Sequence, residues 1–190
     1  GTSIETVSSI KQLAEGLRVG QFFDYESIKR LSLNKTNVDS LLYISVSAYN
    51  KIDEYLRSND RGSLSALMIT GVWIEGEYFA CRVVTDHPDK ILKDRIGEQK
   101  IILNDLLMLL RPYKDTSKEY GKLYGMMEQL SSQYREIKIT YKVGEPQTVE
   151  QNGRLVLIQK EESIVEMTDE QLKKIVGLTL DIRNKLISGE

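Results

Sequence analysis

One long apolar segment, Ser63–Val84, constrains what this chain can fold into more than any other stretch. Its sequence is SLSALMITGVWIEGEYFACRVV, which contains the only Trp and the only Cys of the chain and no Pro. We predict one helix over these residues. Ser63 is its predicted N-cap, because a serine hydroxyl accepts a hydrogen bond from a backbone N–H group that is left free at a helix start.

The predicted helix is apolar on both sides of its helical wheel, which is typical of a helix buried in a protein core or in a membrane. A membrane span needs about 18 or more apolar residues with few charges. Here the uncharged run stops at Ile74 and charged residues follow within the same helix. We therefore predict a central helix buried in a protein core.

Two glycines, Gly71 and Gly76, lie inside this helix without an obvious role in a turn. A glycine in a helix interior lowers helix stability by up to about 1 kcal/mol relative to alanine. We expect the two glycines to allow close approach of neighbouring helices. The alternative is that they leave room for a ligand beside Trp73.

Glu75 is the most interesting ionisable residue, because it falls among apolar neighbours on the wheel. A buried carboxylate must be paired, hydrogen-bonded or protonated. The structural interpretation gives Glu75 a partner on an adjacent helix, with Arg82 two turns along the same polar seam. The functional interpretation makes Glu75 an acid/base or ligand-anchoring group. The candidate ligand-binding or interface residues are Trp73, Glu75, Tyr78 and Arg82.

The composition excludes several classes of site. The chain has 190 residues, a net charge of −2, one Cys and one His, and it has no basic stripe of the kind that binds nucleic acid. Cys81 lies in the apolar helix, where we expect it to pack as a small hydrophobe. His87 is the lone imidazole, so we predict no catalytic triad, metal site or cofactor. Asp86 or His87 is expected to cap the helix that follows.

The rest of the chain completes the predicted fold class. We predict a mainly α protein, a multi-helix bundle around the central buried helix 63–84, with a small β-hairpin before the C-terminal helix. Asn152-Gly153 between two short apolar stretches predicts the hairpin turn, and Thr168 with Gln171 predicts a capping box at the last helix. The segment 137–143 is either a strand or the tail of the preceding helix. All 190 residues are predicted to form one domain, with the hairpin inserted at about residues 137–166.

Three segments together resemble a known family. They are the run GVWIEGEYFA (Gly71–Ala80), the Asn152-Gly153 hairpin, and TDEQL leading into IVGLTLDIRNKLI (Thr168–Ile187). The chain resembles the uncharacterised, mostly helical lipoproteins of Bacteroidota. The resemblance implies a cell-envelope protein that is anchored through a lipidated N-terminal Cys, which we expect to lie upstream of Gly1. It carries over no catalytic residue.

These observations lead to three hypotheses of function. The first is a non-catalytic helical binding or interaction module of the bacterial cell envelope, with a protein or small-molecule partner and no nucleic acid. The second is an enzyme that uses Glu75 as a lone acid/base. The third is a cytoplasmic helical adaptor or regulator that forms a homodimer through the hairpin or through a tyrosine-bearing face.

Overall fold

The computed structural model describes residues 2–26, 38–151, 154–159 and 161–189. The chain forms two compact units, residues 1–65 and 66–190. That all 190 residues form one domain stays a prediction. In chain order the elements are α1 (Thr2–Gly16), η1 (Gly20–Phe22), α3 (Val38–Ser58), α4 (Gly62–Asp86), α5 (Lys90–Leu110), η2 (Arg111–Tyr113), α6 (Lys118–Tyr134), β1 (Lys138–Val143), β2 (Gln147–Gln151), β3 (Arg154–Ile158), β4 (Glu161–Glu166) and α7 (Asp169–Ser188).

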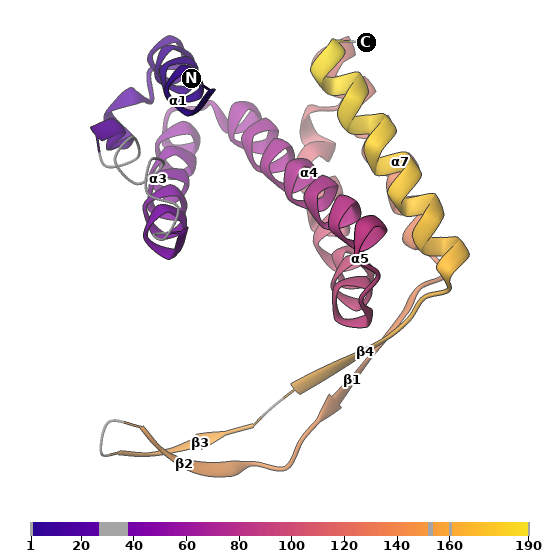
Figure 1. Ribbon diagram of the computed structural model, residues 1–190. Coiled ribbons are helices and arrows are strands. Elements are labelled where there is room, and N and C mark those ends of the chain that lie inside the picture. The colour runs from indigo at the N-terminus through magenta and orange to yellow at the C-terminus, as the bar shows by residue number, and fades with distance from the viewer. Residues whose placement is uncertain (1, 27–37, 152–153, 160, 190) are drawn as a thin grey trace. The chain divides into compact units, whose positions relative to one another are not determined.

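The predicted fold class is confirmed, because the protein is mainly helical and its strands lie between α6 and α7 (Figure 1). The helix predicted over 63–84 is α4, which is longer by one residue at its start and two at its end. Among the described residues, no helix is both long enough and apolar enough to cross a membrane.

The first unit packs α1, η1 and α3 around a small apolar core. The rings of Phe22 in η1 and Tyr55 in α3 lie 5.2 Å apart. The Arg61 guanidinium donates a hydrogen bond of 2.9 Å to the carbonyl oxygen of Leu17, which ties the turn after α3 to the end of α1. The buried apolar residues of this unit are Ala14, Val19, Ala48, Ile52 and Leu56.

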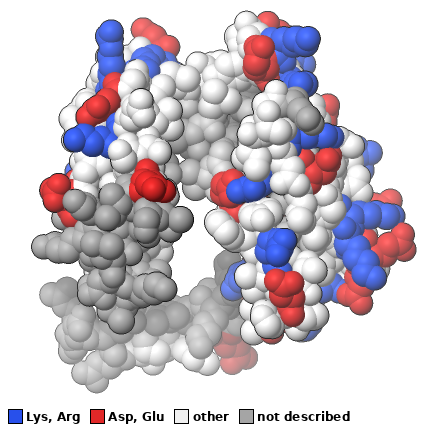
Figure 2. Space-filling model, turned by 45° about the horizontal axis from the view of Figure 1, so that its top comes forward, with Lys and Arg blue, Asp and Glu red and all other residues white. Residues whose placement is uncertain are grey.

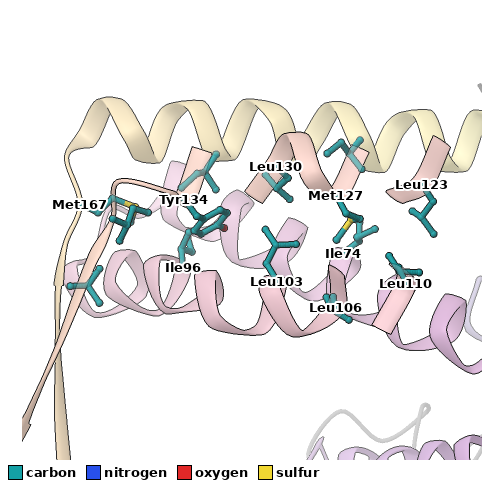
Figure 3. Packing of buried hydrophobic residues seen from close by; sticks show 14 of the residues in the cluster. Ile74, Ile96, Leu103, Leu106, Leu110, Leu123, Met127, Leu130, Tyr134 and Met167 are labelled. Carbon is teal, nitrogen blue, oxygen red and sulfur yellow. The ribbon is translucent and has the colours of Figure 1, made fainter. Parts of the chain in front are cut away.

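The core of the second unit is formed by α4, α5, α6, α7 and the base of the strands (Figure 3). A single narrow stripe of α4 is buried, and its residues recur every three or four positions, which keeps them on one helix face. Val72, Phe79 and Val83, on other faces of α4, are exposed. The prediction that α4 is buried on both sides is therefore corrected to one buried face. That face consists of Ala66, Thr70, Ile74, Glu77, Cys81 and Val84.

The strands form a two-stranded antiparallel ribbon in two segments. β1 pairs with β4 at the base and β2 pairs with β3 further out, so the ribbon extends beyond the helices of this unit (Figure 1). The segment 137–143 is thus a strand from Lys138 onward, as its alternating pattern predicts, and it is not the tail of α6. The sequence did not predict β4. The predicted turn residues, Asn152 and Gly153, lie outside the described residues, and they follow the paired residues Gln151 and Arg154.

Close packing joins the base of the ribbon to α5. Gly97 is buried, and a Cβ atom at this position would lie 2.5 Å from Cγ1 of Val165 in β4. The Lys100 ammonium donates hydrogen bonds to the carbonyl oxygens of Arg135 (2.9 Å) and Ile137 (2.7 Å). It therefore satisfies backbone acceptors where α6 ends and β1 begins, a position that also favours positive charge.

One expectation about a helix start changes and another is confirmed. Asp89, and neither Asp86 nor His87, caps α5 by accepting a hydrogen bond of 2.9 Å from the backbone N–H of Leu92. The Thr168–Gln171 capping box of α7 is confirmed.

The prediction of close helix packing at Gly71 and Gly76 is wrong, because a Cβ atom at either position would meet no other atom of the described residues within 4 Å. The glycine of α4 and α5 that close approach requires is Gly97, under the ribbon.

Replacing Gly97 with alanine tests this packing. The added methyl group would overlap Val165, and we expect a loss of about 1–3 kcal/mol in the free energy of unfolding, measured by urea denaturation. Gly125→Ala in α6 is the matched control. Its Cβ atom would meet no described residue outside the backbone of its own helix within 4 Å, so the substitution should stabilise the helix by up to about 1 kcal/mol. Equal changes in the free energy of unfolding for the two substitutions would show that the ribbon does not pack closely against α5 at Gly97.

Candidate functional site

The four candidate residues on α4 do not form a single site. Glu75 forms an ion pair with Arg183 of α7, with 3.0 Å between Oε1 and Nε, and the Arg183 guanidinium lies 4.6 Å from the centre of the Tyr78 ring. Trp73 instead donates a hydrogen bond of 2.9 Å from Nε1 to Oε1 of Gln99 in α5. Arg82 is exposed and forms no ion pair among the described residues. The structure thus brings together Glu75 and Tyr78, through Arg183.

The partner of Glu75 on an adjacent helix is confirmed. The expected burial of its carboxylate is not, since the Glu75 side chain keeps 41 % of its surface exposed and Arg183 keeps 26 %. Partly exposed ion pairs of this kind contribute about 0–1 kcal/mol to the stability of the folded protein. Stacking of the guanidinium over Tyr78 adds a cation–π contact of the same order. Arg183 of α7 therefore contacts two side chains of α4 and joins the two helices.

The buried carboxyl group of α4 is Glu77, which was not among the candidate residues predicted from the sequence. Glu77 is 4 % exposed. Its Oε1 accepts a hydrogen bond of 2.7 Å from the Tyr134 hydroxyl of α6. Burial raises the pKa of the Glu77 carboxyl to about 7, and the hydrogen bond from Tyr134 partly opposes this rise. The signal that could have identified Glu77 is its spacing of three and four residues from Ile74 and Cys81, both of which are buried.

Two more polar side chains lie close to Glu77. The Cys81 Sγ atom is 3.9 Å from Oε1 of Glu77, and burial, followed by the nearby Glu77 carboxylate, raises the pKa of the thiol to about 12. Cys81 is therefore a neutral, buried thiol, as its predicted role in packing requires. The Thr179 hydroxyl of α7 is buried beside Cys81 and partly opposes the rise in the pKa of the thiol. Together these groups form a polar cluster enclosed in the core: Glu77, Cys81, Tyr134 and Thr179.

A pocket of about 620 Å³ opens at one end of the second unit, between the end of α4 and the starts of α5 and α7. This volume lies in the range of small-molecule sites. Most of the surface that lines it is apolar, and Val84 belongs both to this lining and to the core. None of the four candidate residues lies in it. The lining residues are Val84, Thr85, Pro88, Asp89, Lys90, Lys93, Asp169, Leu172, Lys173, Val176 and Gly177.

Gly177 gives this pocket part of its width. It lies in the interior of α7, where glycine lowers helix stability by about 1 kcal/mol relative to alanine. A Cβ atom at Gly177 would meet no atom of the described residues within 4 Å, apart from the backbone of its own helix, so packing does not require glycine here. A larger side chain at this position would project into the open space of the pocket.

Charged side chains surround the apolar floor of the pocket, and most of them are already engaged. The Lys93 ammonium lies 2.6 Å from Oδ1 of Asp169 and is the main cause of the lowered pKa of that carboxyl. Lys90 pairs with Asp94 at 2.5 Å. Elsewhere the surface charges are mixed, since Figure 2 shows acidic and basic side chains interspersed over the face in view.

Comparisons of the chain with family models, with curated proteins and with solved structures found no match. The resemblance to helical lipoproteins therefore stays a prediction. Within the described parts of the chain, no group of three or more His, Cys, Asp or Glu side chains is placed to hold a metal ion. The pocket is the candidate functional site, because it combines concave shape, apolar lining and a charged rim.

The Glu77 carboxyl should make stability depend on pH. Its folded-state pKa of about 7 lies above the ordinary value of 4.5, so the folded protein holds this proton more tightly than the unfolded chain. Stability contributed by the protonated group is fully present below about pH 4.5 and is lost as the pH rises through about 7. The free energy of unfolding falls by roughly 3 kcal/mol over this range of pH.

We expect Glu77→Gln to flatten this part of the pH profile and to be more stable than the natural protein at about pH 8 by roughly 1–3 kcal/mol. Urea denaturation over a range of pH measures the effect. Glu75→Gln is the control on the same helix; it removes the ion pair with Arg183 and should leave the step near pH 7 in place. If the natural protein and Glu77→Gln keep parallel pH profiles, the buried-carboxyl account is wrong.

Proposed function

We propose that this protein is a non-catalytic helical binding module whose ligand site is the pocket between α4, α5 and α7. The observation that carries the proposal is the pocket itself: about 620 Å³, with mostly apolar walls. Gly177 supports it, because a residue that weakens α7 also keeps the pocket open. The pairing of Glu75 with Arg183 favours a structural role for Glu75 over a catalytic one.

An uncharged apolar probe, octanol, tests this proposal. Titration of ¹⁵N-labelled protein, followed by NMR, should shift the backbone amides around Val84 and Val176 in a saturable way. Gly177→Leu should abolish the shifts by filling the pocket, whereas Gly125→Leu should bind octanol like the natural protein. Gly125 is the matched control because it is also a helical glycine with open space at its Cβ position and does not line the pocket. Equal binding by both variants would contradict the proposal.

We further propose that the module works in the bacterial cell envelope, on the support of the family resemblance. Fractionation of the native cells and intact mass spectrometry of the full-length protein test this location. A diacyl- or triacyl-cysteine in the membrane fraction is the expected result. An unmodified N-terminus in the soluble cytoplasm would contradict it and favour the alternative of a cytoplasmic adaptor.

The ribbon favours a second candidate function, self-association. Leu155 and Leu157 point to the same side of β3, two residues apart, and they are 78 % and 69 % exposed. Apolar side chains on a two-stranded ribbon with free edges are typical of a surface that pairs with another chain.

We expect sedimentation equilibrium to show a concentration-dependent dimer for the natural protein. The double substitution Leu155→Thr and Leu157→Thr should weaken that dimer at least tenfold, because it removes two apolar contacts per chain. Substitution of the exposed Ile187 in α7 with threonine is the control and should leave association unchanged. A natural protein that stays monomeric at all concentrations would refute self-association.

A further inference from the structure

The charges around the pocket show which kind of ligand it would favour. Three lysines and two aspartates line it. Asp169 is held by Lys93 at 2.6 Å, and Asp89 is engaged as the N-cap of α5 through the backbone N–H of Leu92. Both carboxylates therefore already have a donor, and the charge of Asp169 is offset by Lys93.

Among the three lysines that line the pocket, Lys173 is the one without a close ion pair to a described residue. Lys90 is paired with Asp94 and Lys93 with Asp169. Lys173 is exposed and has no carboxylate of the described residues within ion-pair distance, and its charge adds to that of Lys93 in lowering the pKa of Asp169. The helix dipoles of α5 and α7 add positive potential at their N-termini, which lie at this end of the unit. The C-terminus of α4 adds negative potential there and offsets one of these two contributions. The net effect at the rim favours an anionic group beside Lys173.

The apolar floor begins one helical turn from that lysine. Lys173 and Gly177 are four residues apart on α7, so they lie on the same face of the helix. Val176 and Leu172 belong to the same wall, and Val84 faces them from α4. A ligand with its anionic end at Lys173 would therefore place an apolar body beside Gly177 and over Val84.

Resting on the proposed binding function, we propose that the ligand is an aliphatic monocarboxylate, with the carboxylate at Lys173 and the hydrocarbon chain on the floor formed by Val84, Leu172 and Val176. The hydrocarbon chain supplies most of the affinity, because each buried methylene contributes to transfer from water. The contact with Lys173 supplies the preference for an acid over an alcohol or an amine of the same length.

Three probes with the same chain separate these contributions: octanoate, octanol and octylamine, titrated into the full chain at neutral pH and followed by NMR. We expect octanoate to bind about two- to fivefold more tightly than octanol, which is the effect of one partly exposed ion pair. Octylamine should bind most weakly. The preference for octanoate should shrink as the salt concentration rises.

Two lysine variants test the role of the rim. Lys173→Met keeps the length of the side chain and removes its charge, so it should bind octanoate and octanol equally. Lys174→Met is the control, because Lys174 pairs with Glu170 at 3.0 Å, does not line the pocket, and should leave the preference unchanged.

The outcomes distinguish the two proposals. If none of the three probes binds, the proposed binding function fails. If all three bind equally, or octylamine binds best, while Gly177→Leu still blocks them, the pocket is a binding site and the monocarboxylate assignment is overturned. The assignment is also overturned if Lys173→Met keeps the full preference for octanoate.

Discussion

The hydrogen bond between Glu77 and Tyr134 is the interaction on which the second unit depends. A buried carboxyl group without a partner is strongly unfavourable, so α4 can present this face to the core because the Tyr134 hydroxyl donates to Glu77 across 2.7 Å. Tyr134 is itself buried among the apolar side chains of the bundle, as Figure 3 shows. The tyrosine ring contributes apolar surface and its hydroxyl donates to the buried acid, so one residue of α6 contributes to the packing of α4 in two ways.

This arrangement explains why the fold could be predicted from the sequence and the buried face of α4 could not. The length of the apolar segment and the absence of Pro were sufficient for a helix. The face of α4 that packs in the core, however, includes Thr70 and Glu77, while Val72 and Phe79 are exposed. A helical wheel ranks residues by hydrophobicity, and here the core is chosen instead by small size and by a specific hydrogen bond.

The same reasoning applies to the other corrections. Glu75 and Glu77 are two residues apart and therefore lie on different faces of α4. Which of the two acids is buried depends on which face of the helix packs in the core. Gly97 looks ordinary within α5, because the need for a glycine there comes from Val165, which is distant in the sequence. The strand β4 has weak alternation of its own and is ordered by pairing with β1.

The pocket could not be predicted from the sequence for a related reason. Its residues come from a helix end, two helix starts and a short connection, and the packing of α4, α5 and α7 brings them together. Lys173 and Gly177 have no distinctive pattern in the sequence, whereas in the fold they line one wall of a single concavity.

Val84 connects the pocket to the core. It is buried against the bundle and also forms part of the pocket floor, so an apolar ligand would extend the packing of the core by one layer. The ligand would contact α4 and α7, the two helices that Arg183 also joins. A ligand that binds the folded state alone stabilises that state by mass action. Occupation of the pocket would therefore stabilise the packing of α4 against its neighbours, the same packing that the neutral form of Glu77 favours from inside the core.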